Sequence, residues 1–216
     1  MTTSLFSSFD PTSSLMNMNW TMLTMTTIIM PMNFWMKKSR WNKMKEKMEM
    51  LINKEMKNNT KHNEMMILST SLFTIILTMN LMGLMPYSFT PTSHMCISMT
   101  MALPMWMMLM IYGWTKFNNQ MFLHTLPMGT PSMIMPMMII IETTGNLIRP
   151  ISLSVRLTAN MIAGHLLMTL LGNMNESLMI ITLPIQIMLM MFETAISIIQ
   201  AYVFSTLITL YSSEIP

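Results

Sequence analysis

The chain has 216 residues, of which 52% are hydrophobic and only 10% charged, with a net charge of +3. An average soluble domain carries about 25% charged residues, so the composition argues against an ordinary soluble enzyme or binding module. Several apolar runs of about 20 residues are each long enough to cross a hydrocarbon core of roughly 30 Å. We therefore expect a membrane protein with several spans.

Methionine supplies 37 residues, although leucine or isoleucine would serve a lipid-facing helix equally well. An animal-type mitochondrial code reads an isoleucine codon as methionine, so synthesis inside the organelle would explain the excess. The N-terminal stretch MTTSLFSSFDPT contains no Lys or Arg, and so predicts neither a transit peptide nor a secretory signal. Together these features indicate a protein made in the mitochondrion.

The residues that usually hold cofactors are scarce. Cys96 is the only cysteine, which excludes an internal disulfide and a thiolate-ligated iron–sulfur cluster. Only one histidine, His165, lies inside an apolar run, so paired axial ligands for haem are not expected. A phosphate-binding loop of the GxxxxGK[ST] type is absent from the sequence, so ATP itself is expected to bind elsewhere. We expect no cofactor, no metal and no nucleic-acid partner.

In chain order, the first apolar run, 13–35, holds no charge and is predicted to be a span. The next segment, 36–62, carries nine of the twelve basic residues, and its apolar residues recur at helical spacing. This pattern favours an amphipathic helix on a membrane surface, with a solvated basic loop as the alternative. Two clear spans follow, at 65–86 and 95–114.

The basic residues indicate an orientation. The 36–62 segment and Lys116, in a polar loop after the 95–114 span, fall on one side, whereas the links near residues 90 and 174 carry no Lys or Arg. By the positive-inside rule, the basic side is the matrix and the N-terminus faces the intermembrane space.

The last two apolar stretches, 133–172 and 177–212, are too long for ordinary spans. As helices they would measure roughly 60 and 54 Å, nearly twice the hydrocarbon thickness. Each stretch either breaks into two spans or forms one steeply tilted helix, which Pro150 and Pro184 would kink. The residues alone leave both options open.

These stretches contain polar and ionisable residues at depths where each needs a partner or water. Arg156 is the most informative, because arginine keeps its proton at ordinary pH and no acidic residue lies within two turns of it. For Arg149 and Glu142, seven residues apart, an ion pair that only holds helices together is an equal alternative to a functional role. The full set is Glu142, Arg149, Arg156, Asn160, His165, Glu193 and Gln200.

An antiparallel hairpin would place some of these residues at the same depth. In such a hairpin, with a turn near GNMNES, two residues at the same depth lie equally far before and after the turn, so their residue numbers have a constant sum. Arg156 is then level with Gln200, and His165 is level with Glu193. Gln200 and Glu193 then share one face of their helix. The His165–Glu193 pair would lie about 13 Å from the arginine. The result is a polar path that begins at one side of the membrane, passes the His165–Glu193 pair and stops at the fixed positive charge of Arg156.

Two stretches resemble the subunit a family of the F-type ATP synthases in its mitochondrial form. They are RPISLSVRLTANMIAGHLL and ETAISIIQAYVFSTLITLY, and the likeness extends to FDPT near the start and MGLMPYSFTPTS in the middle. It covers nearly the whole chain. The resemblance implies an all-α polytopic membrane protein with one N-terminal span, a matrix-surface amphipathic helix and two further spans. It also implies that the last two stretches are long tilted membrane helices that form a hairpin.

The resemblance further implies roles for single residues. Arg156 matches the family's essential arginine, which faces the carboxylates of the c-ring, and Asn160 follows at the usual offset. His165 and Glu193 match the pair of the half-channel that opens to the intermembrane space.

Two more positions complete the implied proton pathway: Gln200 near the arginine, and Glu142 toward the matrix half-channel. The implied protein is a stator subunit of the mitochondrial inner membrane that has no catalytic site of its own. It would couple proton translocation to rotation and ATP synthesis. Its implied partners are the c-ring, the peripheral stalk, other F0 subunits, the lipid bilayer and protons.

Other classes of membrane protein fit less well. A free-standing ion or solute transporter would use Arg156 to bind an anionic substrate. Transporters usually contain internal repeats, whereas the basic first half and apolar second half of this chain are not alike. A structural anchor would leave Arg156 and Glu193 without a purpose.

Overall fold

The computed structural model describes residues 5–12, 18–29, 37–59, 63–85, 88–126, 129, 131–173 and 179–214. Over these residues the chain is helical and contains no strand, which confirms the predicted all-α class. Its α-helices are α1 (Thr21–Ile29), α2 (Arg40–Asn59), α3 (Asn63–Gly83), α4 (Met95–Lys116), α5 (Asn118–Thr125), α6 (Met135–Gly172) and α7 (Met179–Glu214). Short 3-10 helices are η1 (Leu5–Phe9), η2 (Met18–Trp20) and η3 (Pro91–Ser93).

Four of the described helices, α3, α4, α6 and α7, are long and apolar enough to cross a membrane, which confirms a polytopic membrane protein. α6 and α7 continue through Pro150 and Pro184, so each is one long helix and not two spans. The 38 residues of α6 extend about 57 Å. A helix of that length fits a hydrocarbon core of roughly 30 Å only when it is steeply tilted.

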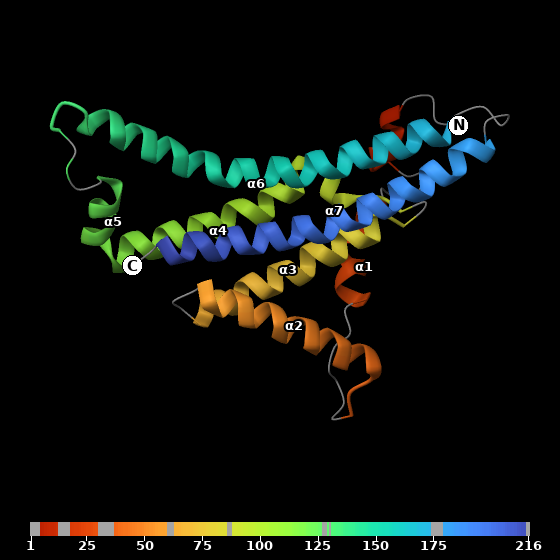
Figure 1. The fold of residues 1–216 in the computed structure, drawn as a ribbon, viewed down its shortest axis with the longest axis horizontal. Helices are drawn as coiled ribbons and strands as arrows, with labels where there is room; N and C mark the ends of the chain where they lie inside the picture. Colours follow the sequence, from red (N-terminus) through yellow and green to blue (C-terminus); the bar gives the residue numbers. More distant parts are fainter. Residues whose placement is uncertain are drawn as a thin grey trace.

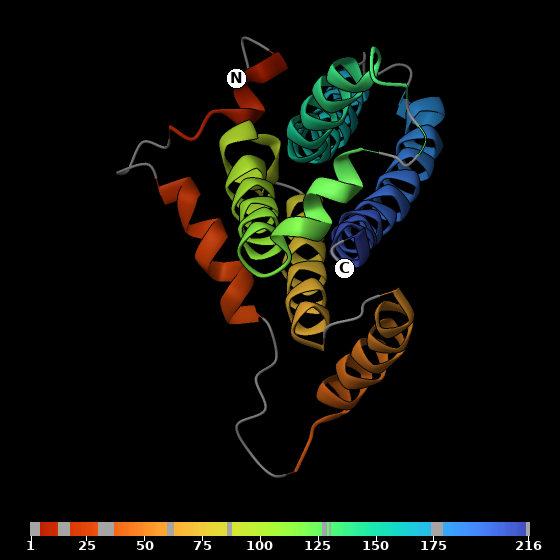
Figure 2. The same ribbon diagram turned by 90° about the vertical axis from the view of Figure 1, so that its left-hand side faces the viewer.

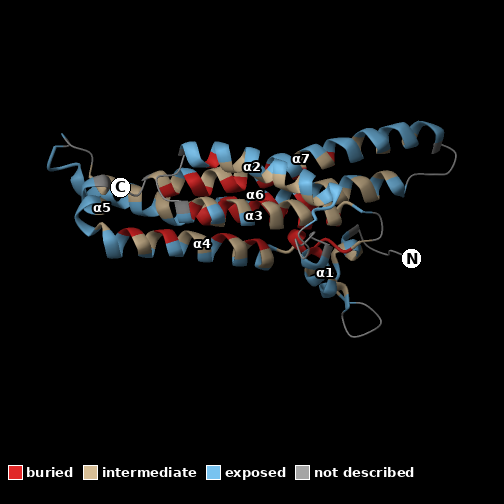
Figure 3. Cartoon of the chain, turned by 90° about the horizontal axis from the view of Figure 1, so that it is seen from below, coloured by how far each residue is buried: buried red, intermediate tan, exposed pale blue. Residues whose placement is uncertain are grey.

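The long helices pack as a bundle around the α6–α7 hairpin. α3 lies against α7, and α4 lies against α6 (Figure 1). The end of α6 and the start of α7 lie at the same end of the molecule as η1, whereas the end of α7 lies at the opposite end, near α5 (Figure 1). Buried residues are concentrated where the four helices overlap, whereas the end of α6 after Met161 is mostly half-buried and the first part of α7 is mostly exposed (Figure 3). The apolar core includes Phe73, Ile76, Ala102, Leu109, Leu153, Leu157, Ala201, Phe204 and Ile208.

The basic segment forms α2, which is set to one side of the bundle (Figure 2). One face contacts α3 and α7 and buries Met56 completely, whereas Trp41 and Met44 on another face are exposed. The hydroxyl of Tyr202 in α7 donates a hydrogen bond to Glu55 at 3.2 Å. The helix over 40–59 lies within the predicted 36–62 segment. Of its apolar residues at helical spacing, Met56 is buried and Ile52 half-buried, whereas Trp41, Met44, Met48 and Leu51 are exposed.

The expected first span, 13–35, falls partly outside the described residues, and within it η2 and α1 are helical over 18–29.

After α4, the structure has the short helix α5 where the sequence predicts a polar loop. The rings of Trp114 and Phe122 meet edge to face with centroids 5.0 Å apart, which holds α5 against α4. This tertiary contact overrides the loop-forming preference of the neighbouring asparagines.

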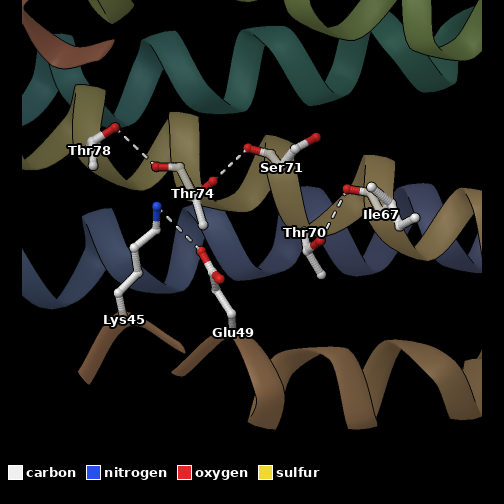
Figure 4. A network of polar contacts seen from close by, with 7 residues as sticks. All are labelled: Lys45, Glu49, Ile67, Thr70, Ser71, Thr74 and Thr78. Carbon is white, nitrogen blue, oxygen red and sulfur yellow. Dashed lines mark hydrogen bonds and ion pairs between the residues drawn. The ribbon is translucent and has the colours of Figure 1, made fainter. Parts of the chain in front are cut away.

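Hydroxyl side chains on α3 bond to the backbone of their own helix (Figure 4). Thr70, Thr74 and Thr78 donate to carbonyls three or four residues earlier, at 3.0, 2.9 and 3.0 Å. Such bonds allow Ser and Thr to lie in an apolar helix without a partner on another element. The Lys45–Glu49 ion pair of α2, 3.6 Å between Nζ and Oε1, lies alongside.

Candidate functional site

Arg156 lies on an exposed face of α6. The side chains one turn before and after it on that face, Ser152 and Ala159, are small and also exposed. Among the described residues, Arg156 has no hydrogen bond or ion pair. Because its charge is permanent, a guanidinium on an apolar helix needs an anion or water from outside the chain.

A cavity of about 240 Å³, here called the inner cavity, lies between α3, α6 and α7. Since one water molecule needs about 10–15 Å³, this cavity has room for several. The structure thus brings together residues from three helices, with Asn80 in α3 120 positions before Gln200 in α7. Its polar lining residues are Asn80, Asn160, His165, Glu193, Ser197 and Gln200.

A hydrogen bond at the inner cavity shows the register of the hairpin. Asn160 Nδ2 donates to Gln200 Oε1 at 3.1 Å. The predicted register puts Gln200 level with Arg156, whereas this bond pairs it with a residue one turn farther along α6, a rise of about 6 Å. Gln200 therefore bonds to Asn160, one turn along α6 from Arg156. Arg156 itself has no hydrogen bond or ion pair among the described residues.

His165 and Glu193 line the same cavity without a hydrogen bond between them. His165 Nε2, Glu193 Oε1 and Gln200 Nε2 are buried and have no hydrogen-bond partner among the described residues. A buried polar atom costs free energy unless it is hydrogen bonded. Since these atoms border a cavity large enough for water, a chain of water molecules is the partner that suits them.

Asn80 is the residue that the sequence analysis missed. Its side chain in α3 is fully buried, and neither its Nδ2 nor its Oδ1 has a hydrogen-bond partner in the described part of the chain. In the run TIILTMNLMG it is a single uncharged amide, so it carries no charge signal. Only the packing of α3 against α7 brings it to the cavity that Glu193 also lines.

A larger cavity of about 760 Å³, here called the outer cavity, lies at the end of the bundle near the turn of the hairpin. It shares His165 and Glu193 with the inner cavity, so polar side chains continue from the molecular surface to the Asn160–Gln200 pair. Its further polar lining residues are Ser7, Ser8, Asp10, Thr12, Asn19, Ser88, Thr169 and Gln186.

The sequence matches the profile of the ATP synthase A chain family over residues 15–213. The chain belongs to this family. It is 46% identical over 224 residues to the ATP synthase subunit a of Locusta migratoria and 45% identical over 225 residues to that of Aedes aegypti. That of Drosophila melanogaster is 46% identical over 224 residues, and each alignment covers 100% of both chains. The family match includes every residue of the inner cavity.

Glu142 and Arg149, which the sequence analysis also singles out, line neither cavity. Glu142 is half-buried in α6, about 21 Å from Arg156 along the helix and on the side away from His165. Arg149 lies over the ring of Tyr211, with Cζ 4.8 Å from the ring centroid. The described residues contain no ion pair between Arg149 and Glu142, so structural pairing of these two is not the arrangement found.

The described residues contain no group of three or more His, Cys, Asp or Glu side chains that could hold a metal ion. The side chains that line the two cavities include imidazole, carboxyl and amide groups, which can form hydrogen bonds and exchange protons. The positive charge of Arg156 lies beside them.

Proposed function

We propose that the chain is the stator subunit a of the membrane F0 sector of ATP synthase, in the mitochondrial inner membrane with its N-terminus toward the intermembrane space. Family membership and the names of the relatives support the assignment to this complex. The observation that carries the mechanism is the position of Arg156. It is an exposed charge with no ion pair among the described residues, one turn from the Asn160–Gln200 pair of a cavity that has room for several water molecules.

In this proposal the two cavities form the half-channel from the intermembrane space. Protons pass the outer cavity, reach His165 and Glu193, and neutralise a carboxylate of the c-ring on the exposed face of the hairpin. A neutral carboxyl can then face lipid, where an ionised one would be very costly. After almost a full turn of the ring, it loses its proton toward the matrix through a second half-channel near Glu142.

Arg156 separates the two half-channels. Its charge attracts the ionised ring carboxylate and so favours release of the proton. Because arginine does not give up its own proton, it cannot relay one directly between the half-channels. Each proton that crosses contributes roughly 2.3 kcal/mol per 100 mV, and a leak past the arginine would lose that free energy. ATP chemistry belongs to other subunits, and the peripheral stalk keeps this subunit from turning with the ring.

The test is Arg156→Ala in the assembled complex, measured as ATP-driven proton pumping in inner-membrane vesicles. We expect pumping to be abolished while the complex still assembles. Arg149→Gln removes an arginine from the same helix, away from both cavities, and is expected to retain pumping. Coupled pumping by Arg156→Ala would overturn the proposal.

Cross-linking distinguishes this proposal from a free-standing transporter. Ser152→Cys, one turn from Arg156 and exposed, is combined with Cys96→Ser and a cysteine near the ring carboxylate. We expect a cross-link to the ring that blocks rotation. If no ring can be linked and the purified chain alone moves a solute, the transporter alternative is correct.

A further inference from the structure

The outer cavity is not built from the hairpin alone. Part of its wall comes from the N-terminal segment, 5–12, with Ser7, Ser8, Asp10 and Thr12, and from Asn19. The only carboxyl groups among its lining residues are those of Glu193, which is buried, and Asp10, which is exposed. His165 lies between the two cavities and completes the titratable groups of the lining.

The backbone of the N-terminal segment is anchored to the membrane helices at Phe9. The ring of His94, at the start of α4, contacts the Phe9 carbonyl oxygen through Nε2 at 3.1 Å. Since a carbonyl oxygen can only accept, Nε2 is the donor. The ring of Phe9 meets that of His165 edge to face, with centroids 6.2 Å apart. Phe9 therefore links the segment to His94 at the start of α4 and to His165 of α6.

The anchor is itself held by a cluster of rings. The His94 ring centroid lies 5.3 Å from that of Trp20 and 5.4 Å from that of Phe89. Trp20 and Phe89 meet each other edge to face at 5.6 Å. These contacts between η2, α4 and the link after α3 give the segment a defined position at the end of the bundle.

Asp10 follows Phe9 directly and is held by its backbone. Its N–H donates to the carbonyl of Ser7 at 3.3 Å, and its own carbonyl accepts from Asn19 Nδ2 at 3.5 Å. Its carboxylate is not used in these two bonds, and the residue is exposed. The segment thus positions a carboxylate at the rim of the cavity that leads to His165 and Glu193.

We propose that residues 5–12 form the outer wall of the proton path and that Asp10 is the group that collects protons for His165 and Glu193. The inference rests on the proposed function and adds a residue to it. A carboxylate at the rim raises the local concentration of protons through its negative charge, and it binds and releases them within reach of the cavity. The N-terminal segment then has a role in transport and is not only a leader to the first helix.

The first experiment replaces Asp10 by Asn in the complete complex and measures ATP synthesis driven by an imposed proton gradient in proteoliposomes. We expect the rate to fall roughly fivefold at low ionic strength, which is the effect of one unit charge acting at about 4 Å in water. The deficit should shrink when salt is raised, because the Debye length falls from about 30 Å at 0.01 M to about 3 Å at 1 M. Asp10→Glu should restore most of the rate. An unchanged rate for Asp10→Asn at low salt would overturn the proposal.

The second experiment tests the wall itself. In a Cys96→Ser background, Ser8→Cys and Phe6→Cys each receive a bulky cationic methanethiosulfonate reagent from the side of the intermembrane space. Ser8 lines the outer cavity, whereas Phe6 is 63% exposed on the same 3-10 helix and does not line it. We expect modification to slow transport in Ser8→Cys and not in Phe6→Cys. Equal effects on the two variants would contradict the assignment of the wall.

The two proposals fail in different ways. If Arg156→Ala is inactive but Asp10→Asn and modified Ser8→Cys transport normally, the N-terminal segment is not part of the path and the stator function stands. If Arg156→Ala still pumps, the stator function fails whatever the N-terminal variants do.

Discussion

Gly164 of α6 and the carboxyl group of Glu193 of α7 are in contact across the hairpin. A Cβ atom on residue 164 would lie 2.9 Å from Cδ and 3.0 Å from Oε1 of Glu193, closer than side chains approach. The absence of a side chain at Gly164 therefore gives the carboxyl its place in the wall shared by the two cavities.

Gly164→Ala should slow proton transport without preventing assembly. The group that must move is the end of a flexible side chain, so the cost in stability is small, but the carboxyl turns away from the cavities. We expect transport to fall roughly tenfold, because proton transfer depends on a donor and an acceptor within hydrogen-bond reach. Gly145→Ala is the matched control, since a Cβ there meets no atom within 4 Å. Equal rates for the two variants would show that the position of Glu193 is unimportant.

Asn80→Leu should reduce transport while leaving stability unchanged or higher. The amide of Asn80 is buried without a hydrogen-bond partner among the described residues, and relief of an unsatisfied buried polar group is worth about 1–3 kcal/mol. Leucine also fills part of the inner cavity and removes two groups that can hold water. The measurements are the thermal midpoint of the solubilised complex and the rate of proton pumping.

Ser69→Ala is the control for the Asn80 substitution. Ser69 is also fully buried on α3, but its hydroxyl donates to the Met66 carbonyl at 2.9 Å and does not reach the cavity. Its loss should leave transport unchanged. If Asn80→Leu pumps as well as Ser69→Ala, the amide is only a packing element.

Variants of His165 and Glu193 should lose less transport than variants of Arg156. His165→Ala and Glu193→Gln are expected to lower transport by degrees, roughly ten- to a hundredfold, because water can partly replace a relay group. Arg156→Lys should abolish coupled transport, since a desolvated lysine releases its proton much more readily than arginine. Pumping and passive proton leak are measured on the same vesicles. A leak-free, pumping Arg156→Lys enzyme would show that any positive charge suffices.

Tyr211→Leu should lower stability, and Tyr211→Phe should not. Arg149 lies over the Tyr211 ring, an interaction worth about 0.5–1 kcal/mol when exposed and about 2 kcal/mol when desolvated. Phenylalanine keeps the ring face, whereas leucine loses it. The readout is the thermal midpoint of the complex with proton pumping measured in parallel. Equal midpoints for the two variants would show that the ring contact contributes nothing.

The long helices and the ionisable side chains could be predicted from the sequence because both rest on strong local signals. Apolar stretches of nearly 40 residues predict helix over α6 and α7, although the residues alone leave open whether each stretch is one helix or two spans. A permanent charge with no acidic residue within two turns identifies Arg156. The register of the hairpin is harder to predict from the sequence. Arg156 and Asn160 lie one turn apart on the same face, so a count of residues cannot decide which of them meets Gln200. The hydrogen bond between Asn160 and Gln200 decides it.

The remaining parts of the site depend on contacts between distant residues. Asn80 is an uncharged amide in an apolar run, and only the packing of α3 on α7 brings it to the cavity. The N-terminal segment has no periodicity that predicts where it lies, because its position depends on His94, 85 residues away from Phe9. Local sequence carries no information about such pairings.

The packing of α3 against α7 has a consequence for how the chain is made. At about 5–20 residues per second, the ribosome completes α7 several seconds after α3 has entered the bilayer. During that interval the buried polar face of α3, with Ser69 and Asn80, lacks the last helix that covers it. A nascent chain stopped before α7 therefore presents an uncovered polar face to lipid.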